Sequence, residues 1–185
     1  MSEPIRIEAP LTDDVVKKLK IGTEVLLSGV IYTARDTAHQ RFVDMLAAGK
    51  PLPFDLKGSI IFYVGPSPAK PGKVIGAAGP TTSYRMDPFA PTLMKNGLKG
   101  MIGKGQRNKG VIDAMKEHVC VYFGATGGAA ALIAKSIVEA QVIAFEELGA
   151  EAVTKLRVKD MPLIVANDCY GGDLYAEGCK KWARP

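Results

Sequence analysis

The fold of this chain follows from one stretch, Gly79-Pro80-Thr81-Thr82-Ser83-Tyr84-Arg85-Met86-Asp87-Pro88. Residues 74–78 before it, Val-Ile-Gly-Ala-Ala, predict a short buried strand, and a helical pattern begins at Phe89 behind it. Asp87 and Pro88 are typical of a helix N-cap and first helical position, because the carboxylate accepts from free backbone N–H groups and proline has none to lose. A strand, a loop and a helix in this order predict an α/β fold with an anion-binding loop, since open α/β sheets bind ligands in such loops.

Length and composition predict one domain that covers residues 1–185. Of the 185 residues, 47% are hydrophobic and 23% are charged, which is ordinary for a globular protein with its own core. No apolar run reaches the ~18 residues that span a bilayer. Residues 1–6 lack the basic end and the apolar core of a signal peptide. We therefore expect a cytoplasmic protein without a membrane-bound part.

The cysteines argue against a disulfide scaffold and against a metal centre on this chain. There are three of them, Cys120, Cys169 and Cys179, and none stands in a C-x-x-C pair. Cys120 lies in a strand-like apolar run, where a small buried side chain is expected. The other two lie in a glycine-rich tail and are interpreted as packing or surface thiols. We expect this chain to bind no metal and no cluster.

Basic residues gather around the opening stretch. Between positions 81 and 109 a single acid, Asp87, stands against six basic residues, Arg85, Lys95, Lys99, Lys104, Arg107 and Lys109. Such a local positive field attracts anions. Because no stacking aromatics are interleaved with these residues, small carboxylates or phosphates are favoured over nucleic acid as partners.

The rest of the chain alternates between strand and helix patterns. Strands are predicted at 5–7, 23–33, 59–64, within 97–105, and at 119–123, 137–145, 153–159 and 162–166. Helices are predicted after Thr12, from Ala38 to Gly49, from Phe89, at 108–116 and 127–134, and after Gly172. Ser28-Gly29 indicates a bulge in its strand. With no internal repeat, one mixed α/β domain is the simplest interpretation.

Three of the cations follow predicted strands or begin helices. Arg35 and Arg85 carry planar, permanently charged forks that suit two carboxylates, and Lys104 adds a compact third charge. A hydroxyl such as that of Thr81 then orients the substrate or takes part in proton transfer. Each residue alone is more often a solvated charge or a turn residue. The repetition of polar groups at strand ends beside glycines is what predicts a dicarboxylate site.

Three motifs resemble those of the class I fumarase and tartrate dehydratase family, in its β subunit or C-terminal domain. They are Arg35-Asp36-Thr37-Ala38-His39, residues 79–87, and Gly103-Lys104-Gly105, and the likeness extends from about Thr23 to Asn167-Asp168-Cys169. The resemblance implies a swivelling β/β/α domain, a mixed central sheet flanked by helices, that supplies half of a hydro-lyase site. It also implies a hetero-oligomer, with a dimer of heterodimers as one arrangement, in which a separate α subunit carries a 4Fe-4S cluster on its own cysteines.

The resemblance also implies roles for individual residues. Arg35, Arg85 and Lys104 match the family's substrate contacts, and Thr81 matches the proposed base. Lys104 is the alternative base, because neighbouring cations favour its neutral form.

Three further motif residues are expected to support the site. We expect Asp36 to pair with Arg35, and His39 to be a hydrogen-bonded support. Thr82 is taken as a supporting hydroxyl.

The implied reaction is the reversible dehydration of L-malate to fumarate. The alternatives are the β subunit of an L(+)-tartrate dehydratase and a stand-alone module that binds an anionic metabolite. Tyr84 is large enough to narrow the pocket, which favours malate or fumarate over tartrate.

Overall fold

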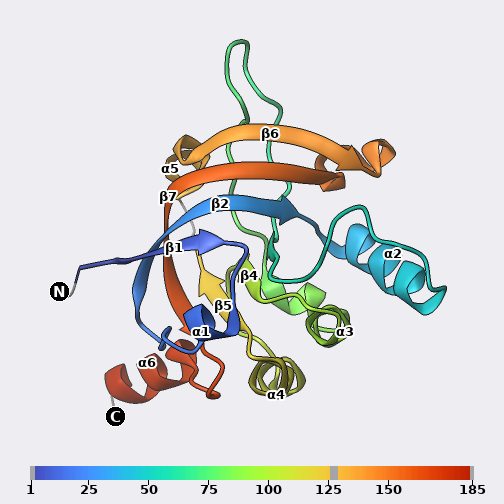
Figure 1. Ribbon diagram of the computed structural model, residues 1–185. Coiled ribbons are helices and arrows are strands. Elements are labelled where there is room, and N and C mark those ends of the chain that lie inside the picture. The colour runs from blue at the N-terminus through green and yellow to red at the C-terminus, as the bar shows by residue number, and fades with distance from the viewer. Residues whose placement is uncertain (1–2, 126–128, 184–185) are drawn as a thin grey trace.

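The computed structural model describes residues 3–125 and 129–183. Its described strands form one mixed sheet (Figure 1). They are β1 (Ile5–Ala9), β2 (Glu24–Thr33), β3 (Ile60–Phe62), β4 (Gly100–Gly103), β5 (Val121–Gly124), β6 (Ile137–Ala144) and β7 (Val153–Asn167). The helices are α1 (Asp13–Val16), α2 (Asp36–Ala47), α3 (Ala90–Lys95), α4 (Lys109–His118), α5 (Ala130–Lys135) and α6 (Leu174–Trp182), with 3-10 turns η1 (Ser83–Met86) and η2 (Glu146–Glu151).

The sheet closes on itself. Strands β1 to β5 pair in sequence order and run parallel, β7 pairs antiparallel with β5, and β7 also pairs antiparallel with β2. The ring therefore runs β2-β3-β4-β5-β7, with β1 attached to β2 and β6 attached to β7. The predicted α/β class, with a mixed central sheet flanked by helices, is confirmed, and the closure by β2 and β7 is an addition to it.

Glycine shapes the bend in β2. The pairing of β2 with β7 shifts register between Leu27 and Gly29, as the predicted bulge requires. Gly29 has a φ of 106°, and a Cβ built on it would lie 2.5 Å from the carbonyl oxygen of Ala9. A residue with a side chain would be strained at this positive φ and would collide with Ala9, so glycine is what allows β1 to lie close to the bend in β2.

Side chains alternate between two cores along the short central strands. Ile60 and Phe62 of β3 point into the ring, and Ile61 between them points toward the helices. The inner core is apolar and includes Leu27, Ile31, Ile102, Phe123, Leu156 and Val165. The outer core lies between the sheet and helices α2, α3 and α4, and includes Phe42, Tyr63, Met86, Leu93, Met115 and Tyr122.

Two local predictions are wrong. Residues 74–78 form no strand; they belong to the arm, residues 65–79, which rises past β6 in Figure 1 and leaves Val74 48% exposed. Pro66, Pro68 and Pro71 remove the N–H groups that a strand ladder needs there. Asp87 is not an N-cap, because α3 begins at Ala90, and the Asp87 carboxylate is buried and bonded elsewhere.

Several other expectations need only small changes. The strands expected at 153–159 and 162–166 are one strand, β7, in which Asp160 has a φ of 48°. The expected cap at Thr12 is confirmed, since its hydroxyl accepts from the N–H of Val15. The helix expected at 127–134 is seen as α5, and its first residues, 127–128, lie outside the described residues.

None of the helices in the described ranges is long and apolar enough to cross a bilayer.

Candidate functional site

The carboxyl ends of β2, β3 and β4 meet at one edge of the sheet, because these strands are neighbours and parallel. Arg35 lies two residues beyond the end of β2, and Lys104 directly follows β4. Thr81 reaches the same edge through the arm, and its backbone N–H donates to the carbonyl of Tyr63 at 2.6 Å, just past β3. Residues far apart in the sequence are thus brought to a common edge.

The loops that carry Thr81 and Lys104 are paired through their backbones. Thr82 and Lys104 form an isolated parallel bridge, and the N–H of Ser83 donates to the carbonyl of Lys104 at 2.9 Å. A Cβ on Gly103 would lie 1.9 Å from the Ser83 hydroxyl, so glycine is required for this approach. Thr81 and Thr82 are half-buried, whereas Lys104 is exposed.

Arg85 and Asp36 form an ion pair across the site. Their Nη2 and Oδ2 atoms lie 2.7 Å apart, with the Arg85 side chain 42% exposed. The expectation that Asp36 pairs with Arg35 is therefore wrong. Arg35 pairs with Glu151 instead, because the turn η2 between β6 and β7 returns beside the end of β2. Nothing in the local sequence around Arg35 indicates this partner.

His39 lies fully buried in the first turns of α2. Its Nδ1 lies 2.8 Å from the carbonyl of Arg35, and its ring meets the Tyr63 ring edge-on at 5.3 Å. Burial lowers the pKa of His39 to about 4, so the neutral ring donates Nδ1–H to that carbonyl. This geometry fits the predicted supporting role, which stays a prediction.

A buried ion pair beneath the site was missed by sequence reasoning. The Nε of Arg107 lies 2.6 Å from Oδ1 of Asp87, and their side chains are 0% and 4% exposed. The other carboxylate oxygen of Asp87 accepts from the N–H of Asn108 at 2.8 Å. The pair therefore ties the end of η1 to the loop that follows Lys104. Tyr122 adds a second tie, since its hydroxyl lies 2.9 Å from that of Ser83 and donates to the carbonyl of Gly105.

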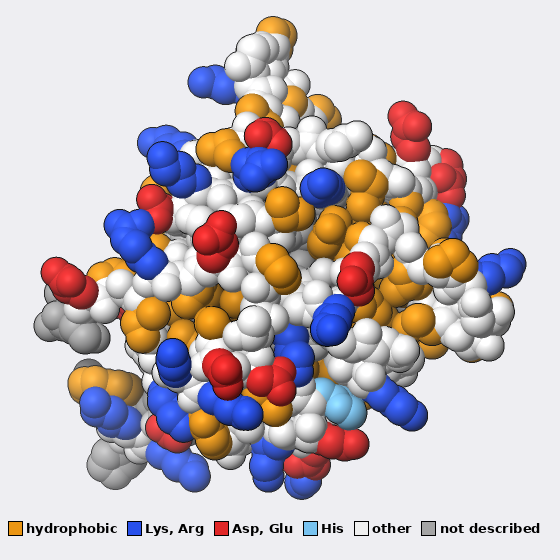
Figure 2. Space-filling view, viewed as in Figure 1, with side chains coloured by type: hydrophobic (Ala, Val, Ile, Leu, Met, Phe, Trp, Pro, Cys, Tyr) orange, Lys and Arg blue, Asp and Glu red, His pale blue; other side chains and the backbone are white. Residues whose placement is uncertain are grey.

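The positive field expected around residues 81–109 is weaker than the residue count indicated. Arg107 is in the core, Lys99 pairs with Asp13, and Lys109 pairs with Asp113. Figure 2 shows Lys and Arg side chains interspersed with Asp and Glu over the face it presents, instead of one continuous basic patch. The edge itself carries the cations Arg35, Arg85 and Lys104, offset by the carboxylates Asp36 and Glu151.

The cysteines and carboxylates of the described residues do not converge. Within 3–125 and 129–183, no group of three or more His, Cys, Asp or Glu side chains could hold a metal ion. Cys120 is buried as expected, and burial raises its thiol pKa to about 12. Cys169 is also buried and Cys179 is exposed. A cluster on a partner chain stays a prediction.

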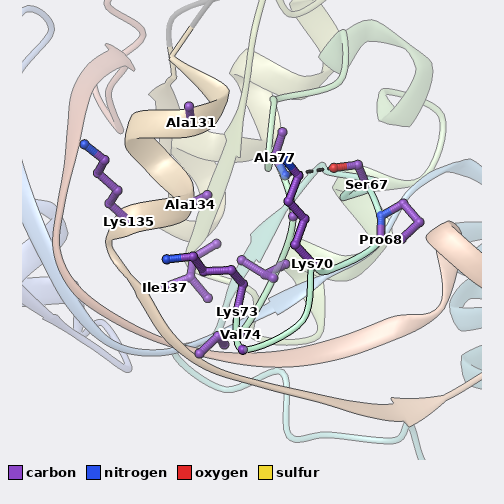
Figure 3. A pocket seen from close by; sticks show the side chains of 13 residues that line it. Ser67, Pro68, Lys70, Lys73, Val74, Ala77, Ala131, Ala134, Lys135 and Ile137 are labelled. Carbon is purple, nitrogen blue, oxygen red and sulfur yellow. Dashed lines mark hydrogen bonds between the residues drawn. The ribbon is translucent and has the colours of Figure 1, made fainter.

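A cavity of about 630 Å³ lies apart from these residues, between the arm and α5 (Figure 3). Its lining combines Val74, Ile75, Ala134 and Ile137 with lysines at its rim. None of the predicted site residues lines it. The edge with Arg35, Thr81, Arg85 and Lys104 remains the candidate site because charge, hydroxyls and strand ends coincide there.

A closed mixed sheet with cations and hydroxyls at the ends of its parallel strands defines an α/β domain with a charged, polar edge. The chain belongs to the fumarase C-terminal family, because the profile described as "Fumarase C-terminus" matches residues 1–178. This confirms the family to which the three motifs pointed.

Relatives in this family include subunits and longer chains. The chain is 42% identical over 177 residues to a "Putative L(+)-tartrate dehydratase subunit beta" of Methanocaldococcus jannaschii, covering 92% of this chain and 91% of that protein. It is 42% identical over 159 residues to "Fumarate hydratase 2" of Leishmania major, and 37% identical to "Fumarate hydratase class I, anaerobic" of Escherichia coli. The chain spans 28% and 29% of these two fumarate hydratases.

Proposed function

We propose that this chain is the β subunit of a two-subunit, iron-sulfur-dependent hydro-lyase that interconverts L-malate and fumarate. The observation that carries the proposal is the meeting of Arg35, Thr81 and Lys104 at the ends of three neighbouring parallel strands. Family membership supports it, since several of the relatives are named fumarate hydratases. A tartrate dehydratase β subunit is the second candidate, because the relative that this chain nearly spans carries that name.

The site chemistry suits a dicarboxylate. The guanidinium groups of Arg35 and Arg85 offer planar donor pairs to two carboxylates, and Lys104 adds a third positive charge. When a proton is removed from the carbon next to a carboxylate, a second negative charge develops on that carboxylate. Fixed cations at this position stabilise the developing charge by several kcal/mol, about 3 kcal/mol for a typical preorganised donor.

Thr81 is the proposed base, and Lys104 is its alternative. The backbone of Thr81 is hydrogen-bonded to the backbones of Tyr63 and Lys104, which holds this residue at the edge. In this proposal the partner chain's cluster supplies the Lewis acid that aids departure of hydroxide. The residues of this chain bind the carboxylates, orient the substrate and move the proton.

The lengths of the relatives support a partner chain. Two named fumarate hydratases are more than three times as long as the segment that matches, whereas the named β subunit has nearly the same length. We infer that the remainder of the activity resides in an α subunit that covers the edge. We also place the enzyme in the cytoplasm, because free cysteines persist in a reducing compartment.

Co-expression with the candidate α chain tests the proposal. After anaerobic reconstitution of the cluster, we expect malate dehydration only when both chains are present, with a higher kcat/KM for L-malate than for L(+)-tartrate. A higher value for tartrate would favour the second candidate. A complex with an intact cluster that dehydrates neither would overturn the proposal, and tight calorimetric binding of a dicarboxylate by this chain alone would favour a stand-alone binding module.

A further inference from the structure

Arg35 lies in a niche that a distant segment of the chain builds. Its Nη2 lies 3.3 Å from Oε1 of Glu151, and the two side chains are 22% and 26% exposed. A Cβ on Gly65 would lie 2.7 Å from Nη1 of Arg35 and 3.2 Å from the carbonyl oxygen of Ala150. The guanidinium group is therefore confined between the start of the arm and the end of η2.

Backbone geometry brings Glu151 to this place. Gly149, two residues earlier, has a φ of 58° and a ψ of −118°, which turns the chain within η2. Directly after Glu151, the carbonyl of Ala152 accepts from the hydroxyl of Thr33 at 3.2 Å, and the same hydroxyl accepts from the N–H of Thr154 at 3.0 Å. Glu151 is thus fastened to the end of β2, next to Arg35.

A second ion pair holds the same turn. Glu147 pairs with Arg41 of α2, and the Arg41 guanidinium lies 4.7 Å from the ring centroid of Phe145. Arg41 and Glu147 are more exposed than Arg35 and Glu151, and neither is among the predicted site residues. This pair offers a matched control for the loss of one carboxylate from η2.

We propose that Glu151 is a positioning residue that orients Arg35 toward a substrate carboxylate, which rests on the proposed role of Arg35. Guanidinium is planar and rigid, so the contact of its Nη2 with Oε1 of Glu151 restricts the orientation of the remaining N–H donors. The same carboxylate also offsets one positive charge at the site. The two effects therefore predict opposite changes when Glu151 is replaced. Loss of orientation lowers the affinity for the substrate, whereas loss of the negative charge raises it.

Two substitutions separate the effects in the reconstituted complex. Glu151→Ala removes the acceptor, and we expect the KM for L-malate to rise roughly tenfold because the binding group loses its alignment, with kcat nearly unchanged. Glu151→Gln keeps an acceptor oxygen and loses the charge, so we expect a KM equal to or below that of the wild type. Glu147→Ala leaves KM unchanged. If both Glu151 variants lower KM, or if Glu151→Ala leaves it unchanged, Glu151 does not position Arg35.

A measurement on the full chain without a partner makes the inference independent of activity. In ¹⁵N spectra of arginine side chains, assigned with Arg35→Lys, we expect slow rotation of the Arg35 guanidinium in the wild type, in Glu151→Gln and in Glu147→Ala. Glu151→Ala speeds this rotation while the far-ultraviolet circular dichroism stays native. If the rotation rate of the Arg35 guanidinium is the same in Glu151→Ala as in the wild type, the inference is overturned. The two proposals can also fail separately. If the Arg35 signal depends on Glu151 but the complex dehydrates neither malate nor tartrate, the proposed function is refuted and the positioning role of Glu151 stands.

Discussion

Thr81 is a half-buried hydroxyl whose backbone N–H is bonded to the carbonyl of Tyr63. If Thr81 is the base, Thr81→Ala should lower kcat by at least about a hundredfold, because positioned proton transfer contributes two to four powers of ten. KM should change little, since the cations that hold the carboxylates remain. Steady-state kinetics of the complex measure both values, and near-normal turnover in Thr81→Ala would move the role to another group.

Lys104 and Arg85 differ from Thr81 because they carry charge. Lys104→Ala and Arg85→Ala should each raise KM by about tenfold or more as well as lowering kcat, since the lost charge-assisted hydrogen bond holds a carboxylate in the bound state and strengthens as negative charge develops in the transition state. The same kinetic assay checks this split. A raised KM without any change in kcat for Lys104→Ala would exclude Lys104 as the alternative base.

His39 makes the stability of the chain depend on pH. Its pKa is about 4 in the fold because of burial, against about 6.5 when unfolded. Below pH ~6.5 this histidine is protonated in the unfolded chain but stays neutral in the native chain. Its contribution to the free energy of unfolding is therefore complete above this pH and is lost as the pH drops. By pH 4 the loss from this group amounts to about 3 kcal/mol.

Urea unfolding of His39→Asn across this range provides the test. We expect its free energy of unfolding to fall less steeply between pH 6.5 and pH 4 than that of the wild type. The control variant is His118→Asn, which replaces the other histidine, at the end of α4, and leaves the buried ring of His39 in place. Equal slopes for all three proteins would show that His39 is protonated as readily in the fold as outside it.

At the scale of elements, η1 and the loop after β4 behave as one unit. The bridge between Thr82 and Lys104 and the Arg107–Asp87 ion pair join these two segments directly. The hydroxyl of Tyr122 on β5 joins them indirectly, since it contacts the Ser83 hydroxyl and donates to the carbonyl of Gly105. Arg107 also lies 5.0 Å from the centroid of the Tyr122 ring. Because Arg85 lies on η1 and Lys104 on the loop, their spacing depends on these buried ties.

Breaking the buried ion pair should cost far more than breaking a surface pair. Arg107→Met leaves the Asp87 carboxylate buried without its cation, and we expect a loss of about 3–5 kcal/mol in the free energy of unfolding. The double variant Arg107→Met/Asp87→Leu should lose less than the sum of its two single variants. Urea denaturation measures these values, and Lys109→Ala, which breaks an exposed pair on α4, serves as the control. A strictly additive double variant would contradict the coupling.

At the scale of the whole molecule, the closed ring and the arm are separate features. The two limbs of the arm are joined to each other near its base, where the N–H of Ser67 donates to the carbonyl of Ala77 at 3.1 Å and the N–H of Ala77 donates to the Ser67 hydroxyl at 2.8 Å. Residues 67–74 are exposed, whereas Ile75 packs against the inner core. The cavity in Figure 3 is bounded by the arm and therefore depends on it.

Shortening the arm tests this separation. Replacing residues 68–74 by Gly-Gly keeps Ile75 and the base, so we expect the free energy of unfolding to change by less than about 1 kcal/mol, since exposed loops contribute little. Chemical denaturation with two spectroscopic probes gives this value. Loss of a single cooperative transition would show that the arm is part of the core.

Much of the secondary structure could be predicted because its causes are local. The β-branched run at 59–64, the glycine that bends β2 and the cap at Thr12 act through neighbouring residues. The order of the parallel strands then brings Arg35, Thr81 and Lys104 to one edge, which the positions of the motifs already indicated. The apolar residues 74–78 misled because their composition suits a strand, whereas three nearby prolines and the turn at Gly72 make an arm.

The sequence by itself determined which residues are apolar, which can bend the chain and which carry the charge and hydroxyls of the site. Only the tertiary structure decided their partners: Glu151 for Arg35, Arg85 for Asp36, Arg107 for Asp87, and β7 for the open edge of β2. The physical reason is that an ion pair or a strand pairing depends on distance in space. Segments remote in the sequence become neighbours only when the ring closes and buries its two cores.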